Sequence, residues 1–302
     1  MPLELKSREL YVTLYDGHIS PTLGCYELGE LTPEVIGRWQ ADRLASGAPI
    51  ESTRKALTLL GGILQRAMEA GRIPANPARL VRKASATARE EVRPLAPATV
   101  EAVRTLLAPR HAIFVSLLAY AGLRPQEALA LRWGHVLEST LIVHAPKTRR
   151  HRQQPRTVRQ LAPVAQDLRE WRFATGRPDP DRPVIVGQNG EAWTEVGYEQ
   201  WRAKAWKKAL GRAGFPYQRP YDLRHSFASL LLHEGRSVVY VARQLGHGAQ
   251  LTLRTYGHVI DDLDVAPRIS AEDAIRLARE SVSEKCPPVA LADSGGGPKI
   301  GS

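Results

Sequence analysis

Hydrophobic residues in the first 80 positions recur at the three- and four-residue spacing of amphipathic helices. Thr32-Pro33-Glu34 predicts a helix start, because a hydroxyl can cap free backbone N–H groups and proline fits the first turn. A second helix is predicted from about Ser52 to Ala70, followed by Gly71. The apolar positions of the two helices are Val35, Ile36, Trp39, Leu44, Leu57, Leu60, Ile63, Leu64 and Ala67. Residues 1–82 are therefore predicted to form a small helical bundle.

The pattern changes at residues 83–96, which are basic and polar, contain Pro94 and have few apolar side chains. This composition is typical of an interdomain linker. Beyond it, the pattern predicts helices near 97–107, 110–121 and 125–131, extended segments around 141–143 and 157–158, and helices again from 163 to about 256. The predicted fold class is mainly α with a small β-sheet (α+β), and residues 97–260 form the second domain.

Two further segments follow that domain. Residues 261–286 contain an amphipathic helix from Ser270 to Glu284, and the members of its apolar face are Ala274, Ile275, Leu277 and Ala278. An exposed face of this kind needs a partner. Residues 287–302 are rich in Pro, Gly and Ser, and their few apolar side chains cannot offset the entropy of ordering, so they are predicted to be a disordered tail.

Charge and composition narrow the class of protein. The 302 residues carry 42 basic and 31 acidic side chains, a net charge of +11, which favours polyanionic partners. The longest apolar run, from Ala112 to Leu123, is shorter than the roughly 18 to 20 residues of a membrane-spanning helix. Cys25 and Cys286 are far apart and have no ligand-like neighbours, so neither a disulfide framework nor a metal site is expected. We therefore expect a cytoplasmic, nucleic-acid-binding protein without a membrane partner.

The segment Tyr221-Asp222-Leu223-Arg224-His225 is predicted to open a helix. Asp222 is expected to cap this helix. Arg224 would then lie in the first turn, where free N–H groups and the helix dipole favour a phosphate.

Three other short segments carry candidate chemistry. In Gly122-Leu123-Arg124-Pro125-Gln126-Glu127, the carboxylate of Glu127 can meet Arg124 on one helix face and hold its guanidinium. Leu245-Gly246-His247 ends a predicted helix, and Tyr256 follows His247 after nine residues. Pro146-Lys147-Thr148 comes just after the first predicted strand.

These segments, in this order and spacing, resemble the tyrosine recombinase (phage integrase) family over roughly residues 95–258. The resemblance implies a site-specific enzyme that cuts and rejoins double-stranded DNA through a 3′-phosphotyrosyl intermediate, with no metal and no cofactor. Tyr256 would be the nucleophile and Lys147 the acid that protonates the departing 5′ oxygen. Arg124, Arg224 and His247 would stabilise the charged phosphorus centre, with Glu127 and His225 as supporting residues.

The resemblance also implies an arrangement on DNA. Residues 1–82 resemble the helical core-binding domain of these integrases, and the expected partner is a DNA site bound by a tetramer at the bacterial nucleoid. In related recombinases the segment after the nucleophile docks on the neighbouring protomer, which is expected for 270–284; docking on its own domain is the alternative. The residues expected to contact DNA are Arg82, Lys83, Arg149, Arg150 and Arg152.

The sequence departs from the family pattern at Tyr221, where a histidine usually stands. A phenol can donate to a phosphate oxygen but is a poor base at neutral pH. A DNA-binding accessory protein with a decayed site therefore stays open as an alternative. A type IB topoisomerase-like enzyme is a second alternative, because it performs the same chemistry without a partner duplex. Each residue also has a plain structural interpretation: Tyr256 as a packing residue, the arginines and Lys147 as solvated or paired cations, and His247 as a helix-end histidine.

Overall fold

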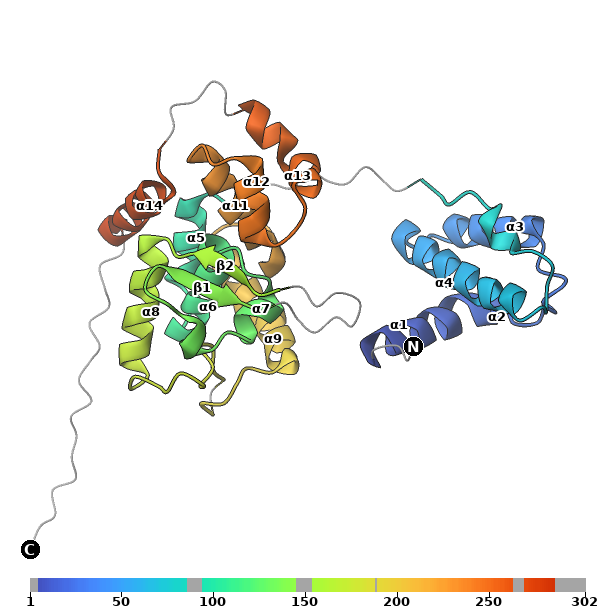
Figure 1. Ribbon diagram of the computed structural model, residues 1–302, viewed down its shortest axis with the longest axis horizontal. Coiled ribbons are helices and arrows are strands. Elements are labelled where there is room, and N and C mark those ends of the chain that lie inside the picture. Colours follow the sequence, from blue (N-terminus) through green and yellow to red (C-terminus); the bar gives the residue numbers. More distant parts are fainter. Residues whose placement is uncertain (1–4, 86–93, 145–153, 188, 263–268, 286–302) are drawn as a thin grey trace, which may run out of the picture. The chain divides into compact units, whose positions relative to one another are not determined.

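The computed structural model describes residues 5–85, 94–144, 154–187, 189–262 and 269–285. The chain divides into two compact units, Met1–Glu91 and Val92–Ser302 (Figure 1). Lys147, Arg149, Arg150, Arg152, the middle of the predicted linker and the predicted tail lie outside the described residues.

The first unit is a bundle of helices around Trp39. The side chain of Thr32 accepts a hydrogen bond from Val35 N, so the predicted cap is confirmed. The helix predicted to begin at Ser52 begins two residues earlier, at Ile50. The elements are α1 (Leu5–Leu14), the π-helix η1 (Tyr15–Ile19), α2 (Ser20–Leu23), α3 (Pro33–Ala45), α4 (Ile50–Glu69) and η2 (Pro77–Arg79). Ile36, Leu57 and Leu64 pack with Trp39 in the core of this unit.

The ends of the predicted linker pack against the two units. Gln40 on α3 donates to the carbonyl of Arg82 at 3.0 Å and accepts from Ala84 N at 3.1 Å. At the other end, Leu95 is buried and its N–H donates to Ser226 Oγ at 3.0 Å. Ala84 and Leu95 of the predicted linker thus bind side chains of neighbouring helices, which composition alone does not show.

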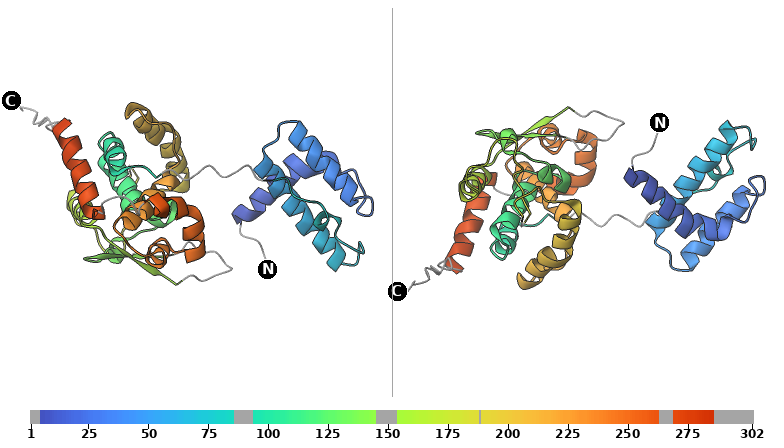
Figure 2. Two further views of the ribbon diagram at one scale, coloured as in Figure 1. Left: turned by 90° about the horizontal axis from the view of Figure 1, so that it is seen from above. Right: turned by 90° about the horizontal axis from the view of Figure 1, so that it is seen from below.

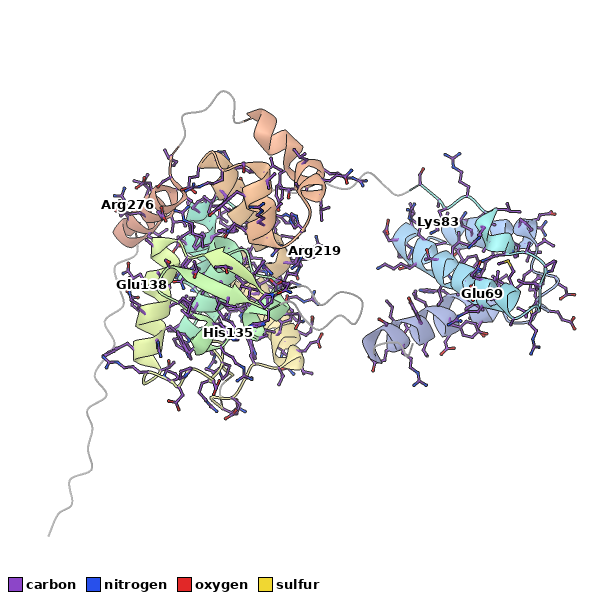
Figure 3. The ribbon with its side chains drawn as sticks, viewed as in Figure 1. Glu69, Lys83, His135, Glu138, Arg219 and Arg276 are labelled. Atoms are coloured by element: carbon purple, nitrogen blue, oxygen red, sulfur yellow. The ribbon has the colours of Figure 1, made fainter. Side chains whose placement is uncertain are left out.

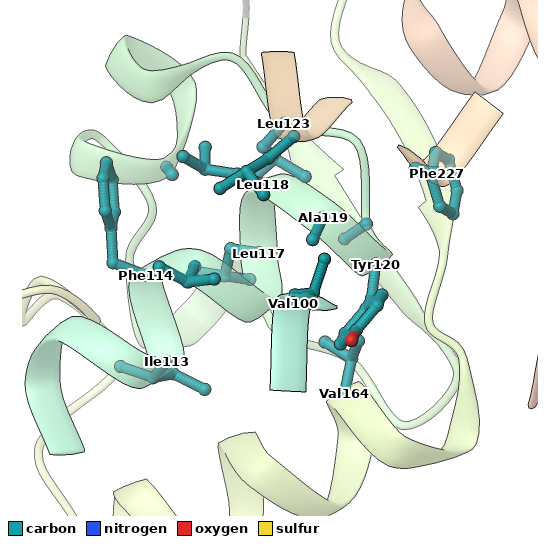
Figure 4. Packing of buried hydrophobic residues seen from close by; sticks show 14 of the residues in the cluster. Val100, Ile113, Phe114, Leu117, Leu118, Ala119, Tyr120, Leu123, Val164 and Phe227 are labelled. Carbon is teal, nitrogen blue, oxygen red and sulfur yellow. The ribbon is translucent and has the colours of Figure 1, made fainter. Parts of the chain in front are cut away.

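The second unit is built around α6, whose residues from Ile113 to Tyr120 are all buried (Figure 4). Helix α11 packs along α6, and Phe227 reaches the same core. The helices predicted near 97, 110 and 125 are confirmed. The elements of the first half are α5 (Pro97–Arg104), α6 (Pro109–Tyr120), α7 (Pro125–Leu129), η3 (Trp133–His135), β1 (Thr140–Val143), β2 (Arg156–Arg159) and α8 (Ala162–Ala174).

The predicted sheet is confirmed as one antiparallel pair of strands. Leu141 pairs with Val158, and both side chains are buried. Helix α12 packs on β2, so the pair is held between core and helix. The remaining elements are α9 (Glu195–Trp201), η4 (Arg202–Trp206), α10 (Lys207–Arg212), η5 (Pro220–Asp222), α11 (Leu223–His233), α12 (Val238–Leu245), α13 (Ala249–Asp262) and α14 (Ala271–Lys285).

Helix α14 packs on its own unit, which was the alternative to docking on a neighbouring protomer. It lies along α5 of its own unit (Figures 1 and 2), and Ile275 is completely buried there. Arg279 donates to Asp167 on α8 at 2.8 Å. Ala274, Ile275 and Ala278 of its apolar face are covered within the chain, whereas Leu277 is exposed. Arg276 on the same helix is exposed too (Figure 3).

Candidate active site

Glu127 is the centre of the site, and its side chain is completely buried. Its carboxylate accepts from Arg124 Nη1 at 2.7 Å and from Arg124 N at 2.8 Å, so the predicted pairing is confirmed. The geometry differs from the prediction, because Arg124 does not lie on the helix. It precedes α7 in an extended conformation, since Pro125 occupies the first turn, and its backbone N–H is therefore free for Glu127.

Arg156 on β2 binds the same carboxylate, and the sequence analysis missed it. Its Nη1 and Nη2 lie 2.8 and 2.7 Å from the two oxygens of Glu127, and its Nε donates to Gln244 O at 2.9 Å. One signal could have found it. Alternate residues of a strand share a face. Because Val158 faces the core, Arg156 is expected to face inward too.

Arg224 lies in the first turn of α11 and is almost entirely buried. Its guanidinium donates to the carbonyls of Gly122 and Leu245, and its Nη1 lies 3.9 Å from Glu127. Gly122 has a φ of +62°, and a Cβ there would lie 2.3 Å from the ring of Phe227. Glycine is therefore required for the turn that presents its carbonyl to Arg224.

The predicted role of Asp222 as a helix cap is wrong. Asp222 makes no side-chain cap to α11, because η5 runs directly into that helix and leaves Asp222 in a helical conformation. Its carboxylate instead accepts from the backbone N and guanidinium of Arg219 at 3.0 to 3.2 Å.

The charges around Glu127 do not cancel. Burial opposes its ionisation, but the hydrogen bonds and charges of Arg156 and Arg124 lower the pKa of Glu127 to about 2. Burial and the charges of Arg124 and Arg156 lower the pKa of Arg224 to about 10, so it keeps its proton at neutral pH. Three guanidinium groups thus face one carboxylate, and the excess positive charge suits an anion such as a phosphate.

His247 lies beside this arginine cluster. Helix α12 ends at Gly246, which has a φ of +66°, and the next residue is His247. The Nδ1 atom of His247 lies 3.1 Å from Thr252 Oγ1. Burial lowers the pKa of His247, as do the charges of Arg224 and Arg124. An open pocket adjoins it, lined by Gln154, Arg156, Ala242, Arg243, Gly246, His247 and Gly248.

Tyr256 lies on α13 and is almost fully buried. Its hydroxyl lies 2.6 Å from Nδ1 of His225, the residue after Arg224. Burial raises the pKa of the Tyr256 phenol, while the charge of Arg224 acts in the opposite direction. A hydrogen-bonded His225 was expected, but its partner was not, because the two residues are 31 positions apart.

Tyr221 also contacts the His225 ring. The two rings meet edge to face with centroids 6.0 Å apart, and Tyr221 is 41% exposed. Burial lowers the pKa of His225 to about 4, so its imidazole is neutral at neutral pH.

The predicted DNA-contacting residues Arg82 and Lys83 belong to the first unit. Both are exposed, and Lys83 Nζ donates to Thr58 Oγ1 at 3.0 Å (Figure 3). Within the described residues, no cluster of three His, Cys, Asp or Glu side chains could hold a metal ion. In the same residues, no helix combines the length and apolar character needed to cross a membrane.

Comparison with known proteins identifies the class. The sequence matches the phage integrase family over residues 89–262. It is 29% identical to tyrosine recombinase XerC of Xanthomonas axonopodis pv. citri over 221 residues, which cover 70% of this chain and 69% of XerC. The chain therefore belongs to the phage integrase family, whose members are site-specific tyrosine recombinases that cleave and rejoin DNA.

Solved structures support the same fold. Lambda integrase (residues 75–356), a dimer bound to a COC' core site, has a TM-score of 0.68 at 15% identity, covering 83% of this chain and 91% of that one. A lambda integrase tetramer bound to a Holliday junction has a TM-score of 0.66 at 15% identity, and the match covers 82% of this chain and 73% of that one. These likenesses extend over both units of the chain and support the fold described above.

Proposed function

We propose that this recombinase cuts DNA with Tyr256 and stabilises the reacting phosphate with Arg124, Arg224 and His247. The observation that carries the proposal is the convergence of these side chains from separate elements. Arg224 is close enough to act on the pKa of both Tyr256 and His247, and Arg124 acts on His247 as well. A nucleophile, two guanidinium groups and an imidazole thus share one region of positive potential.

The proposed reaction follows from the charge of the transition state. Attack by the Tyr256 oxygen on phosphorus gives a five-coordinate centre with negative charge on its non-bridging oxygens. Fixed donors stabilise that charge without reorganisation, and the guanidinium groups are fixed by Glu127 and by the carbonyls of Gly122 and Leu245. The 5′ oxygen leaves and Tyr256 stays joined to the 3′ phosphate.

The leaving oxygen needs a proton, and Lys147 is the proposed donor. Lysine suits this role because its pKa can fall and its proton can be released, whereas arginine keeps its proton. Arg156 is proposed as a further positioning residue, because it donates to both carboxylate oxygens of Glu127. Tyr221 is proposed to donate from its exposed hydroxyl to a phosphate oxygen.

We propose that the partner is a double-stranded DNA site and that the working form is a tetramer. The lambda integrase structures above are bound to a core site and to a Holliday junction, the second as a tetramer. The first unit would act as the core-binding domain, with Arg82 and Lys83 on phosphates, and Arg149, Arg150 and Arg152 would follow the backbone in the second unit. The site of action would be the bacterial cytoplasm, at the nucleoid, in the service of a phage or another mobile element.

The test is a nicked suicide duplex that traps the covalent adduct. Tyr256→Phe is expected to abolish the adduct and to leave duplex affinity nearly unchanged, because the hydroxyl is needed only for attack on phosphorus. Tyr240→Phe, on α12, is the matched control and is expected to form adduct normally. An adduct on Tyr256→Phe would overturn the mechanism.

A further inference from the structure

We propose that His225 accepts the hydroxyl proton of Tyr256 when that tyrosine attacks DNA. This inference rests on the proposed nucleophilic role of Tyr256. It assigns a catalytic residue where the sequence offered only a supporting one, and it answers the question that Tyr221 raises, because a phenol is a poor proton acceptor at neutral pH.

The geometry places an acceptor on the reacting atom itself. His225 Nδ1 lies 2.6 Å from Tyr256 Oη, and the two ring centroids are 5.6 Å apart. Both side chains are fixed by their elements. His225 follows the buried Arg224 on α11, and Tyr256 is enclosed on α13. Among the hydrogen bonds of the described residues, this is the contact that the Tyr256 hydroxyl makes with a titratable side chain.

The protonation state of His225 suits an acceptor. Burial lowers its pKa to about 4, so the imidazole is neutral at neutral pH. In the tautomer that carries its proton on Nε2, the Nδ1 atom accepts a hydrogen bond from the Tyr256 hydroxyl. Asp222 from η5 raises the pKa, whereas Arg224 on the same helix, Arg219 before η5 and His247 after α12 lower it. The negative charge of an arriving phosphodiester would raise the pKa of His225, which increases its proton affinity when attack begins.

The proposed step balances in protons and bonds. The Tyr256 oxygen forms a bond to phosphorus while its proton passes to His225 Nδ1. The bond from phosphorus to the 5′ oxygen breaks, and that oxygen takes a proton from Lys147, as proposed above. In the reverse direction, a 5′ hydroxyl attacks the phosphotyrosine and the His225 imidazolium returns the proton to Tyr256.

The first test compares His225→Ala, His225→Asn and the control Tyr240→Phe by single-turnover cleavage of the suicide duplex. The asparagine can hold a hydrogen-bond acceptor near the Nδ1 position but cannot take a proton. Both His225 variants are expected to cleave roughly 10²- to 10⁴-fold more slowly, whereas Tyr240→Phe keeps the rate of the unmodified protein. His225→Asn carries the test if the cavity left by alanine unfolds the protein. An asparagine variant at the unmodified rate would overturn the proposal, because position alone would then suffice.

The second test separates proton acceptance from proton donation. A 5′-bridging phosphorothiolate substrate has a sulfur leaving group that needs no protonation. It therefore restores the rate of a variant that lacks the proton donor, but not of one that lacks the proton acceptor. The His225 variants are expected to remain slow on this substrate, and their cleavage rate is expected to rise with pH from about 7 to 9.5 as solvent hydroxide replaces the acceptor. If the His225 variants recover the unmodified cleavage rate on the phosphorothiolate substrate, or if their pH profile is parallel to that of the unmodified protein, proton acceptance by His225 is rejected.

The two proposals fail in distinguishable ways. If Tyr256→Phe still forms an adduct, the nucleophile is wrong and the inference about His225 falls with it. If Tyr256→Phe forms none but both His225 variants cleave at the unmodified rate or faster, only the role of His225 is wrong. In that case the 2.6 Å contact between His225 and Tyr256 would not assist the attack on phosphorus.

Discussion

At the scale of single residues, the site depends on one buried carboxylate. Glu127 is contacted by Arg124 and Arg156, and Arg224 lies within 3.9 Å of it. A buried charge that loses its partner is strongly destabilising, because the remaining groups stay desolvated. Glu127 is therefore a structural requirement as well as a way of aiming the guanidinium groups.

We expect Glu127→Gln to lower the free energy of unfolding by about 3 to 5 kcal/mol and to slow cleavage. The loss depends on pH. The folded-state pKa of Glu127, about 2, lies below the ordinary value of 4.5, so its stabilisation is complete above about pH 4.5 and is lost as pH falls toward 2. Urea unfolding at a series of pH values measures this. Glu138→Gln, at an exposed position, is the control, and equal stability of the two variants at pH 7 would contradict the expectation.

The sequence motifs predicted Arg124, Glu127, Arg224, His247 and Tyr256, and the structure brings these residues into one region. Two contacts could not be predicted. Arg156 lies 29 positions from Glu127, and His225 lies 31 positions from Tyr256, so each pair meets only through the packing of separate elements. A motif records spacing along the chain, whereas these contacts depend on how β2 and α13 are placed.

At the scale of elements, helix starts and apolar periodicity predicted most of the helices and both strands. The partner of α14 was not predictable, because an apolar face shows that something covers it but not what. Ile275 is buried on its own unit, whereas Leu277 on the same helix is 52% exposed. The pairing of Arg279 with Asp167 adds a polar contact to that interface.

Ile275→Ala is expected to cost about 2 to 5 kcal/mol in the absence of DNA, because it leaves a cavity against α5. Leu277→Ala is the matched control and is expected to change stability little, since the same apolar volume is removed from an exposed position. Thermal unfolding of the monomeric protein measures both. If the two variants unfold alike, α14 does not dock on its own unit in solution.

At the scale of the whole molecule, the proposed mechanism takes from side chains the positive charge that a phosphoryl-transfer enzyme often takes from metal ions. Arg124, Arg156 and Arg224 supply it, and the chain carries +11 overall. We therefore expect strand cleavage in excess EDTA at the rate seen with magnesium. A magnesium-dependent nuclease on the same duplex provides the control. Loss of cleavage with EDTA, restored by magnesium, would contradict this expectation.

The order of the site residues along the chain has a consequence for control of the enzyme. Arg124, Glu127 and Arg156 precede the turn at Gly176, and Arg224 and Tyr256 follow it. Cutting the chain at this exposed turn would give two pieces, one holding the buried carboxylate and the other the tyrosine. Each piece alone would be harmless to a genome, so a recombinase active only when two separately expressed halves meet could be made from this chain.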